Sequence, residues 1–351
     1  MRSISLVVVL AAAPIVFASM RLSQQAPTAG PYKVLKTTKV GGEGGYDYIF
    51  ADVEGRRLYV PRGGPTGQLM VFNLDTLDPV GVVADVRAGG ATVDPKSHHG
   101  FSTTKPLTMW DATTLKVIKT IEVDGRPDGI LYDHFNARVW VLSHQPPHAT
   151  VIDAAEGSVV KTLDLGGAPE QAVSDGKGTI YVNIADKANI AVVDAKNLTV
   201  TAHYDMSSKG TGGSGLAFDA KNRILFAYYR QPSPVVVIVN AENGNIITTL
   251  PTGMGVDTVA FNPATLEAIS AEYAGSMTFI KENSPTSFVV EQTLQTMVGA
   301  KTLALDTKTN HLVTMAAEFG PPAPDAPSGP AGRPARGPMI PGSFSILMVG
   351  K

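Results

Sequence analysis

Four acidic residues recur at matching places along the chain and have the chemistry of a metal site. They are Asp47, Asp128, Glu170 and Asp257. Carboxylate oxygens are ligands that Ca²⁺ prefers, and this ion takes about six to eight oxygen ligands in all. If the four side chains converge, we expect them to hold Ca²⁺. No other cofactor is evident in the sequence.

The same connections also carry basic and amide side chains, which allow a second interpretation. Arg87, Arg126 and Lys301 would neutralise the acids, and Tyr46 and Gln171 would add polar contacts. A surface of this kind would bind a ligand directly, without a metal. The residues alone leave both interpretations open.

Two histidines form a further candidate in the segment His144-Gln-Pro-Pro-His148. Their i, i+4 spacing resembles that of zinc-protease helices, but Pro146 and Pro147 exclude a helix. We therefore treat His144 and His148 as loop residues that could contact a ligand or zinc. The chain has no Gly-x-Ser-x-Gly motif, phosphate-binding Walker loop or dinucleotide fingerprint, so no catalytic residue is predicted.

The elements that position these residues can be predicted from a repeat. An apolar strand, a turn led by Asp or Asn, and a second apolar strand recur at intervals of roughly 39 to 44 residues. A period of about 40 to 45 residues with several short strands is typical of a β-propeller blade. The sequence therefore predicts an all-β, seven-bladed β-propeller. The turns begin at Asp52, Asp94, Asp133, Asp175, Asp219, Asn262 and Asp306.

The two ends of the repeat array predict how the ring closes. The last repeat supplies three strands, and residues 32–38 match the pattern of the missing fourth strand. We expect this N-terminal strand to pair into the last blade, because closure leaves no free edge between blades. Residues 31–351 then form a single propeller. A Pro- and Gly-rich segment, residues 320–342, is predicted to be a loop insertion in the last blade, with a flap, a docking tether and a neutral insertion as its alternatives.

The first residues predict export. A basic start, an apolar stretch from Leu6 to Phe17 and small residues after it are typical of a signal peptide, which we place at residues 1–20. The stretch is short for a membrane span, so no span is expected after cleavage. The sequence thus predicts a periplasmic or secreted protein.

Composition excludes several classes of function. The chain has no Cys, which excludes disulfides, thiol catalysis and Cys-ligated metals. Its formal net charge is −2, so we expect no nucleic-acid partner.

Several segments resemble a known family. Tyr181-Val182-Asn183, Tyr59-Val60-Pro61 and the recurring Val-Ile-Asp turns followed by Lys-Thr-Leu strands are similar to the YVTN-repeat, or YncE-like, family of exported bacterial seven-bladed propellers. The resemblance covers nearly the whole mature chain and rests on structural residues. Departures are Asn262-Pro263, Lys281 and the insertion. The resemblance implies an exported WD40-like propeller with no assigned enzyme activity.

These observations together predict a binding protein. In a propeller, the connections from the fourth strand to the next first strand, and from the second to the third, meet on one face around the channel. We call this the channel-side face and expect it to contact a small molecule or an envelope protein. The alternative is a metal-assisted, lactonase-like hydrolase that uses the acidic channel residues.

Overall fold

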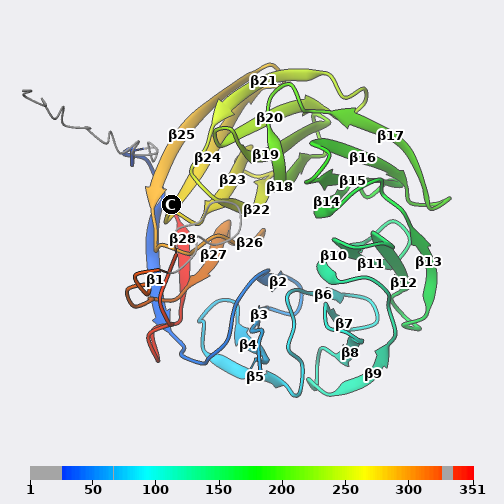
Figure 1. Ribbon diagram of the computed structural model, residues 1–351, viewed down its shortest axis with the longest axis vertical. Coiled ribbons are helices and arrows are strands. Elements are labelled where there is room, and N and C mark those ends of the chain that lie inside the picture. Colours follow the sequence, from blue (N-terminus) through cyan, green and yellow to red (C-terminus); the bar gives the residue numbers. More distant parts are fainter. Residues whose placement is uncertain (1–25, 66, 326–334) are drawn as a thin grey trace, which may run out of the picture.

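The computed structural model describes residues 26–65, 67–325 and 335–351. These residues form seven four-stranded antiparallel sheets arranged in a ring, without any helix (Figure 1). The predicted seven-bladed propeller is confirmed. The expected signal peptide, residues 1–20, lies outside the described residues. Within the described residues we find no candidate for a membrane-spanning helix.

The first four blades follow the chain without interruption. Blade 1 contains β2 (Phe50–Asp52), β3 (Arg57–Pro61), β4 (Leu69–Asn73) and β5 (Pro79–Val83). Blade 2 contains β6 (Ala91–Asp94), β7 (His99–Ser102), β8 (Leu107–Asp111) and β9 (Val117–Ile121). Blade 3 contains β10 (Pro127–Asp133), β11 (Arg138–Ser143), β12 (Ala149–Asp153) and β13 (Val159–Leu163). Blade 4 contains β14 (Pro169–Ser174), β15 (Thr179–Ile184), β16 (Asn189–Asp194) and β17 (Thr199–Asp205).

The last three blades complete the ring. Blade 5 contains β18 (Thr211–Asp219), β19 (Ile224–Gln231), β20 (Val235–Asn240) and β21 (Ile246–Pro251). Blade 6 contains β22 (Val256–Asn262), β23 (Glu267–Glu272), β24 (Ser276–Ser284) and β25 (Ser287–Gln295). Blade 7 contains β26 (Leu303–Asp306), β27 (His311–Ala316), β28 (Ser345–Gly350) and, from the N-terminal end of the chain, β1 (Lys33–Lys39).

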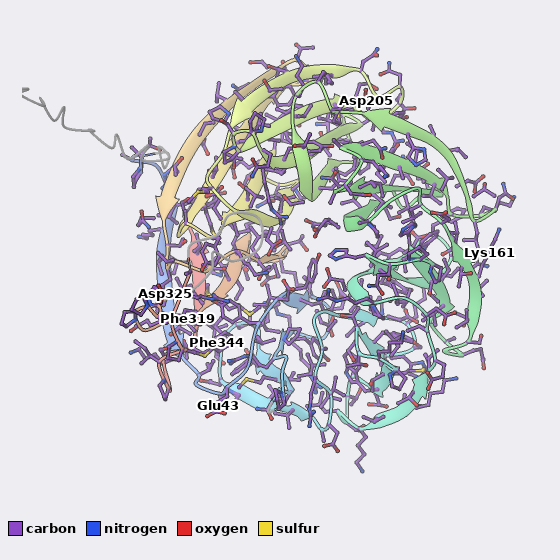
Figure 2. All side chains as sticks on the ribbon, viewed as in Figure 1. Glu43, Lys161, Asp205, Phe319, Asp325 and Phe344 are labelled. Carbon is purple, nitrogen blue, oxygen red and sulfur yellow. The ribbon has the colours of Figure 1, made fainter. Side chains whose placement is uncertain are left out.

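Burial changes from the middle strands of each blade to its outer strand. In β11, Val139, Trp140, Val141 and Leu142 are all buried, because neighbouring blades cover both faces of the strand. In β13, by contrast, the first four residues are exposed, and Lys161 lies on the outer rim (Figure 2). A charged, exposed outer strand protects the edge of a sheet against pairing with other chains.

The Asp-led turns join the innermost strand of a blade to the second. Asp52 Oδ1 accepts a hydrogen bond from the backbone N–H of Gly55 (2.9 Å), and Asp219 Oδ1 accepts one from Lys221 (2.9 Å). Short acidic side chains stabilise turns in this way. The repeated Asp residues are therefore structural.

The N-terminal strand closes the ring as predicted. β1 lies beside β28 (Figure 1). The two strands pair antiparallel, with Val34 opposite Val349. Just before β1, the ring of Tyr32 stacks on Phe279 of blade 6 at 3.8 Å between centroids. The first strand of the chain is thus the outermost strand of the last blade.

The Pro- and Gly-rich segment lies between β27 and β28. Its base is paired, since the Ile340 N–H donates to the Glu318 carbonyl (2.8 Å) and Phe319 forms an isolated bridge with Met339. The guanidinium of Arg336 lies 4.1 Å from the centre of the Phe319 ring, which is labelled in Figure 2. The same guanidinium lies 5.8 Å from the centre of the Tyr273 ring, so this part of the insertion also contacts blade 6.

Candidate functional site

Corresponding positions of the seven blades surround the channel mouth on the channel-side face. Each lies five residues before the Asp or Asn that leads the turn, at or just before the innermost strand. Three of the seven residues are Asp, and the other four are of different types. In blade order the residues are Asp47, Gly89, Asp128, Glu170, Ser214, Asp257 and Lys301.

Lys301 links two of the four predicted acids. Its Nζ donates to Asp47 Oδ1 (2.6 Å) and to Asp257 Oδ2, and its side chain is only 11% exposed. Burial disfavours the ammonium charge, but the two carboxylates outweigh burial and raise the pKa of Lys301 above its ordinary value. Lys301 is therefore a cation that bridges blades 1, 6 and 7.

Arg230 extends this network to the third acid. It donates to Asp257 Oδ1 (2.7 Å), and its guanidinium lies 3.9 Å from Glu170 Oε1. Burial, together with the nearby Asp257 and Asp128, raises the pKa of Glu170 to about 8, although Arg230 acts in the opposite direction. The Glu170 carboxyl therefore titrates close to neutral pH.

The fourth acid, Asp128, lies beside a histidine. His144 stands in the connection between β11 and β12, and its Nε2 is 3.2 Å from Asp128 Oδ2 and 3.7 Å from Glu170 Oε1. One ligand atom from each of the three side chains lies within 4.8 Å of the others. The structure thus brings together Asp128, Glu170 and His144.

The four predicted metal ligands consequently form two groups around one mouth. Asp47 and Asp257 share Lys301, whereas Asp128 and Glu170 face His144. Calcium binding by all four remains a prediction.

A small cavity opens on this mouth between blades 1, 2 and 3. It has a volume of about 300 Å³ and is lined by Asp47, Arg87, Gly89, Arg126 and Asp128, among others. Gly89 places no side chain where five other blades carry a charged residue and one carries a serine, so this sector of the mouth is open.

The side chains of two arginines at this cavity have no partner among the described residues. Arg87 and Arg126 are exposed, and the guanidinium of each makes no hydrogen bond or ion pair with any residue that the structure describes. They come from neighbouring blades. The cavity therefore has a cationic rim above an inner wall whose charges are largely paired.

Three other predicted site residues make structural contacts. The amide of Gln171 bonds the backbone of Leu216 and Val259, tying blade 4 to blades 5 and 6. The Tyr46 hydroxyl donates to the Gly299 carbonyl (3.3 Å). The Nδ1 atom of His148 lies 2.6 Å from Asp164 Oδ1. His148 thus contacts Asp164, whereas His144 lies beside Asp128.

Two residues at the mouth are not among the site residues predicted from the sequence. Arg230 is the residue before the last of β19, and no motif distinguishes it from other charged residues on this face. Tyr48 lines a second cavity, which also contacts Glu170 and Gln171. Burial, together with the charges of Asp128 and Glu170, raises the pKa of Tyr48 well above its ordinary value. Its position one residue after Asp47 was the only available signal.

Comparison with known proteins identifies the fold class. No protein-family model matches the sequence, and no curated protein matches it. Among solved structures, the chain is similar to RRP9 WD40 repeats, with a TM-score of 0.71, 10% identity and coverage of 93% of this chain and 100% of that one. It is also similar to U3-55K (TM-score 0.69, 10% identity, 92% and 99% coverage) and to a chain of the Mitotic Checkpoint Complex (0.68, 11%, 90% and 94%).

These similarities define the class of protein. The chain is a seven-bladed β-propeller of WD40-like architecture. At such low identities the likeness concerns the fold alone. The finer resemblance to the YVTN-repeat family is not confirmed.

Proposed function

We propose that this chain is an exported binding protein that holds a small anionic molecule at the channel mouth between blades 1 and 3. The observation that carries this proposal is the pair Arg87 and Arg126, which line one cavity and whose guanidinium groups have no partner among the described residues. A guanidinium presents two parallel N–H groups that match a carboxylate or a phosphate. Two such groups favour a ligand with two acidic oxygen clusters.

The surrounding charges support this ligand class. Lys301 and Arg230 form ion pairs with Asp47, Asp257 and Glu170. These pairs neutralise most of the negative charge on the inner wall of the cavity. An anion entering the cavity then meets the unpaired arginines first. An envelope protein would use the same site by presenting an acidic side chain to it.

Export remains part of the proposal. It is supported by the signal-like residues 1–20 and the resemblance to YVTN-repeat propellers. The mass of the intact protein recovered from the cell envelope or the medium tests it. A mass that lacks about 20 N-terminal residues is expected. A full-length mass confined to the cytoplasm would contradict export.

Calorimetric titration with malonate and with inorganic phosphate tests the binding site. We expect one of the two to bind, and the substitutions Arg87→Gln and Arg126→Gln each to weaken binding at least about tenfold, because each removes a charge-assisted pair. Arg138→Gln is the matched control, since it makes the same charge change at the first residue of β11. Unchanged binding in both site variants, or no binding of either probe, would refute the proposed site.

A second candidate function is metal-assisted hydrolysis, of which lactone opening is one example. The grouping of Asp128, His144 and Glu170 favours it, because two carboxylates and an imidazole are suitable zinc ligands. Its test is hydrolysis of simple lactones by the full chain before and after chelation. Activity that chelation removes and Zn²⁺ restores would support this function, and no activity in either state would exclude it for these substrates.

A further inference from the structure

We infer that Asp128, His144 and Glu170 form a binding site for one divalent transition-metal ion of the zinc type. This inference rests on the proposed use of the channel mouth and adds a cation beside the arginine pair. The three residues come from β10, the β11–β12 connection and β14, and thus from two adjacent blades.

The first argument is the state of the ligand atoms. His144 Nε2 is shielded from solvent and has no hydrogen-bond partner among the described residues, although it lies 3.2 Å from Asp128 Oδ2. Neither the Asp128 nor the Glu170 carboxylate accepts a hydrogen bond from a described residue. Buried polar atoms normally find partners. His144 Nε2 and Asp128 Oδ2 are thus close together but not aligned for a hydrogen bond, as expected of two atoms that bind the same metal ion.

The second argument is distance. Zinc ligands of the N and O type lie about 2.1 Å from the ion, so two of them at tetrahedral angles are about 3.4 Å apart. The separations of 3.2 and 3.7 Å from His144 Nε2 to the two carboxylates lie on either side of this value. The third separation, between the Asp128 and Glu170 carboxylates, is within 4.8 Å, so both carboxylates would have to turn toward one tetrahedral ion.

The third argument is ligand type. Ca²⁺ takes only oxygen ligands, about six to eight of them, whereas an imidazole nitrogen with two carboxylates suits Zn²⁺ and its neighbours in the first transition row. Three protein ligands leave the fourth position open.

Hydrogen bonds of Ser143 fix the conformation of the connection that carries His144. Ser143 donates its backbone N–H to the His148 carbonyl (2.9 Å), and its Oγ donates to the Gln145 carbonyl (2.6 Å) and accepts from the Arg126 N–H (2.7 Å). Such contacts around a ligand reduce the ordering cost of metal binding. Arg126 thereby links the proposed metal site to the anion-binding cavity.

The test is a titration of the full chain, without an affinity tag, after chelator treatment and dialysis into a weakly coordinating buffer. Co²⁺ alone is the probe, because tetrahedral Co²⁺ absorbs visible light far more strongly than octahedral Co²⁺. We expect one Co²⁺ per chain with the tetrahedral spectrum, and loss of that spectrum on adding Zn²⁺. A chain that binds no Co²⁺, or only octahedral Co²⁺, would overturn the inference.

Matched variants locate the ion. His144→Asn should weaken binding more than about 100-fold, because loss of an outer contact alone costs about 10–100-fold. The near-isosteric Asp128→Asn and Glu170→Gln should weaken it as well, with thermal melting as the check of folding. His148→Asn, in the same connection, should retain the site, since His148 contacts Asp164. Binding unchanged in His144→Asn would overturn the inference.

The metal test and the anion test are separable. The Co²⁺ titration contains no malonate or phosphate, and Arg87→Gln should leave its stoichiometry at one. Failure of metal binding would therefore leave the arginine site untouched, and failure of anion binding would leave the metal site untouched.

Discussion

The Nζ atom of Lys301 lies 2.6 Å from Oδ1 of Asp47, and this pair joins the last blade of the ring to the first. The same Nζ also bonds Asp257, so one cation serves two carboxylates that are both part of the channel mouth. The ring is therefore closed in two places. Ion pairs of Lys301 join blades 1, 6 and 7 on the channel-side face, and the pairing of β1 with β28 completes blade 7 at the outer rim.

Substitution of Lys301 should destabilise the protein strongly. Lys301→Met leaves Asp47 and Asp257 near one another without their cation, and breaking a buried ion pair costs about 3–5 kcal/mol. Urea unfolding measures the change. Lys308→Met is the control, because Lys308 and Glu54 form an exposed pair at 3.6 Å, worth about 1 kcal/mol or less. Equal effects of the two substitutions would contradict the role of Lys301.

The stability of the protein should fall with rising pH through the titration of Glu170. Its pKa is about 8 in the folded chain and near 4.5 when exposed, so the folded state binds the proton more tightly. The resulting stabilisation is complete below about pH 4.5 and disappears as pH rises to about 8, with a magnitude on the order of 3–5 kcal/mol.

Glu170→Gln removes this titration. The variant should lose less stability than the natural chain between pH 5 and about pH 8, as measured by urea midpoints. Glu156→Gln, at an exposed turn position, is the charge-matched control. Parallel pH profiles of the natural chain and Glu170→Gln would show that Glu170 does not titrate in this range.

Deletion of residues 31–39 should lower the melting temperature by more than about 10 °C, because it removes β1 and the stacking of Tyr32 on Phe279 and exposes β28 as an edge. A chain that lacks residues 2–25 is the control for truncation. Calorimetry gives the melting temperatures. A small effect of the longer deletion relative to the control would argue against closure by β1.

Arg62 is a buried cation that pairs with no carboxylate among the residues that the structure describes. Its side chain donates to the carbonyls of Gly41 (3.1 Å), Gly42 (3.2 Å) and Gly44 (2.9 Å) and stacks on Phe344. Burial lowers its pKa to about 10.

Arg62→Met should therefore cost about 2–4 kcal/mol, because three carbonyls lose their donor. It should also weaken anion binding, since the same segment leads into Asp47. Arg138→Met serves as the control in both measurements. A stability loss without any change in binding would show that the segment does not position the cavity.

Replacement of residues 322–336 by a short Gly-Ser turn should cost only about 1 kcal/mol, mainly from loss of the Arg336 contact with Phe319. The paired base around Glu318 and Ile340 is retained. Anion binding of this variant distinguishes a neutral insertion from the other two roles. Retention favours a neutral insertion, and loss favours a flap or tether.

The fold could be predicted from the sequence because every blade repeats the same local chemistry. The turn at Asp219, for example, needs its carboxylate to satisfy backbone N–H groups, and such requirements recur in every repeat. Ring closure was predictable for a related reason, since the strand missing from the last repeat had only one matching segment elsewhere.

The grouping of the mouth residues could not be predicted. Asp47 and Asp128 occupy the same position of their repeats, yet one pairs with Lys301 and the other lies beside His144. Which partner each acid meets depends on neighbouring blades and side-chain directions. Gln171 follows Glu170 directly, but alternation along a strand directs it elsewhere, onto the backbone of Leu216 and Val259.

The pairing of β1 with β28 also has a consequence for biosynthesis. The ring cannot close until the ribosome has released the residues that form β28, so an incomplete chain keeps an unpaired sheet edge in its last blade. Proteases and chaperones recognise such edges and exposed apolar surface. A prematurely terminated copy therefore lacks the strand pairing that stabilises the finished propeller.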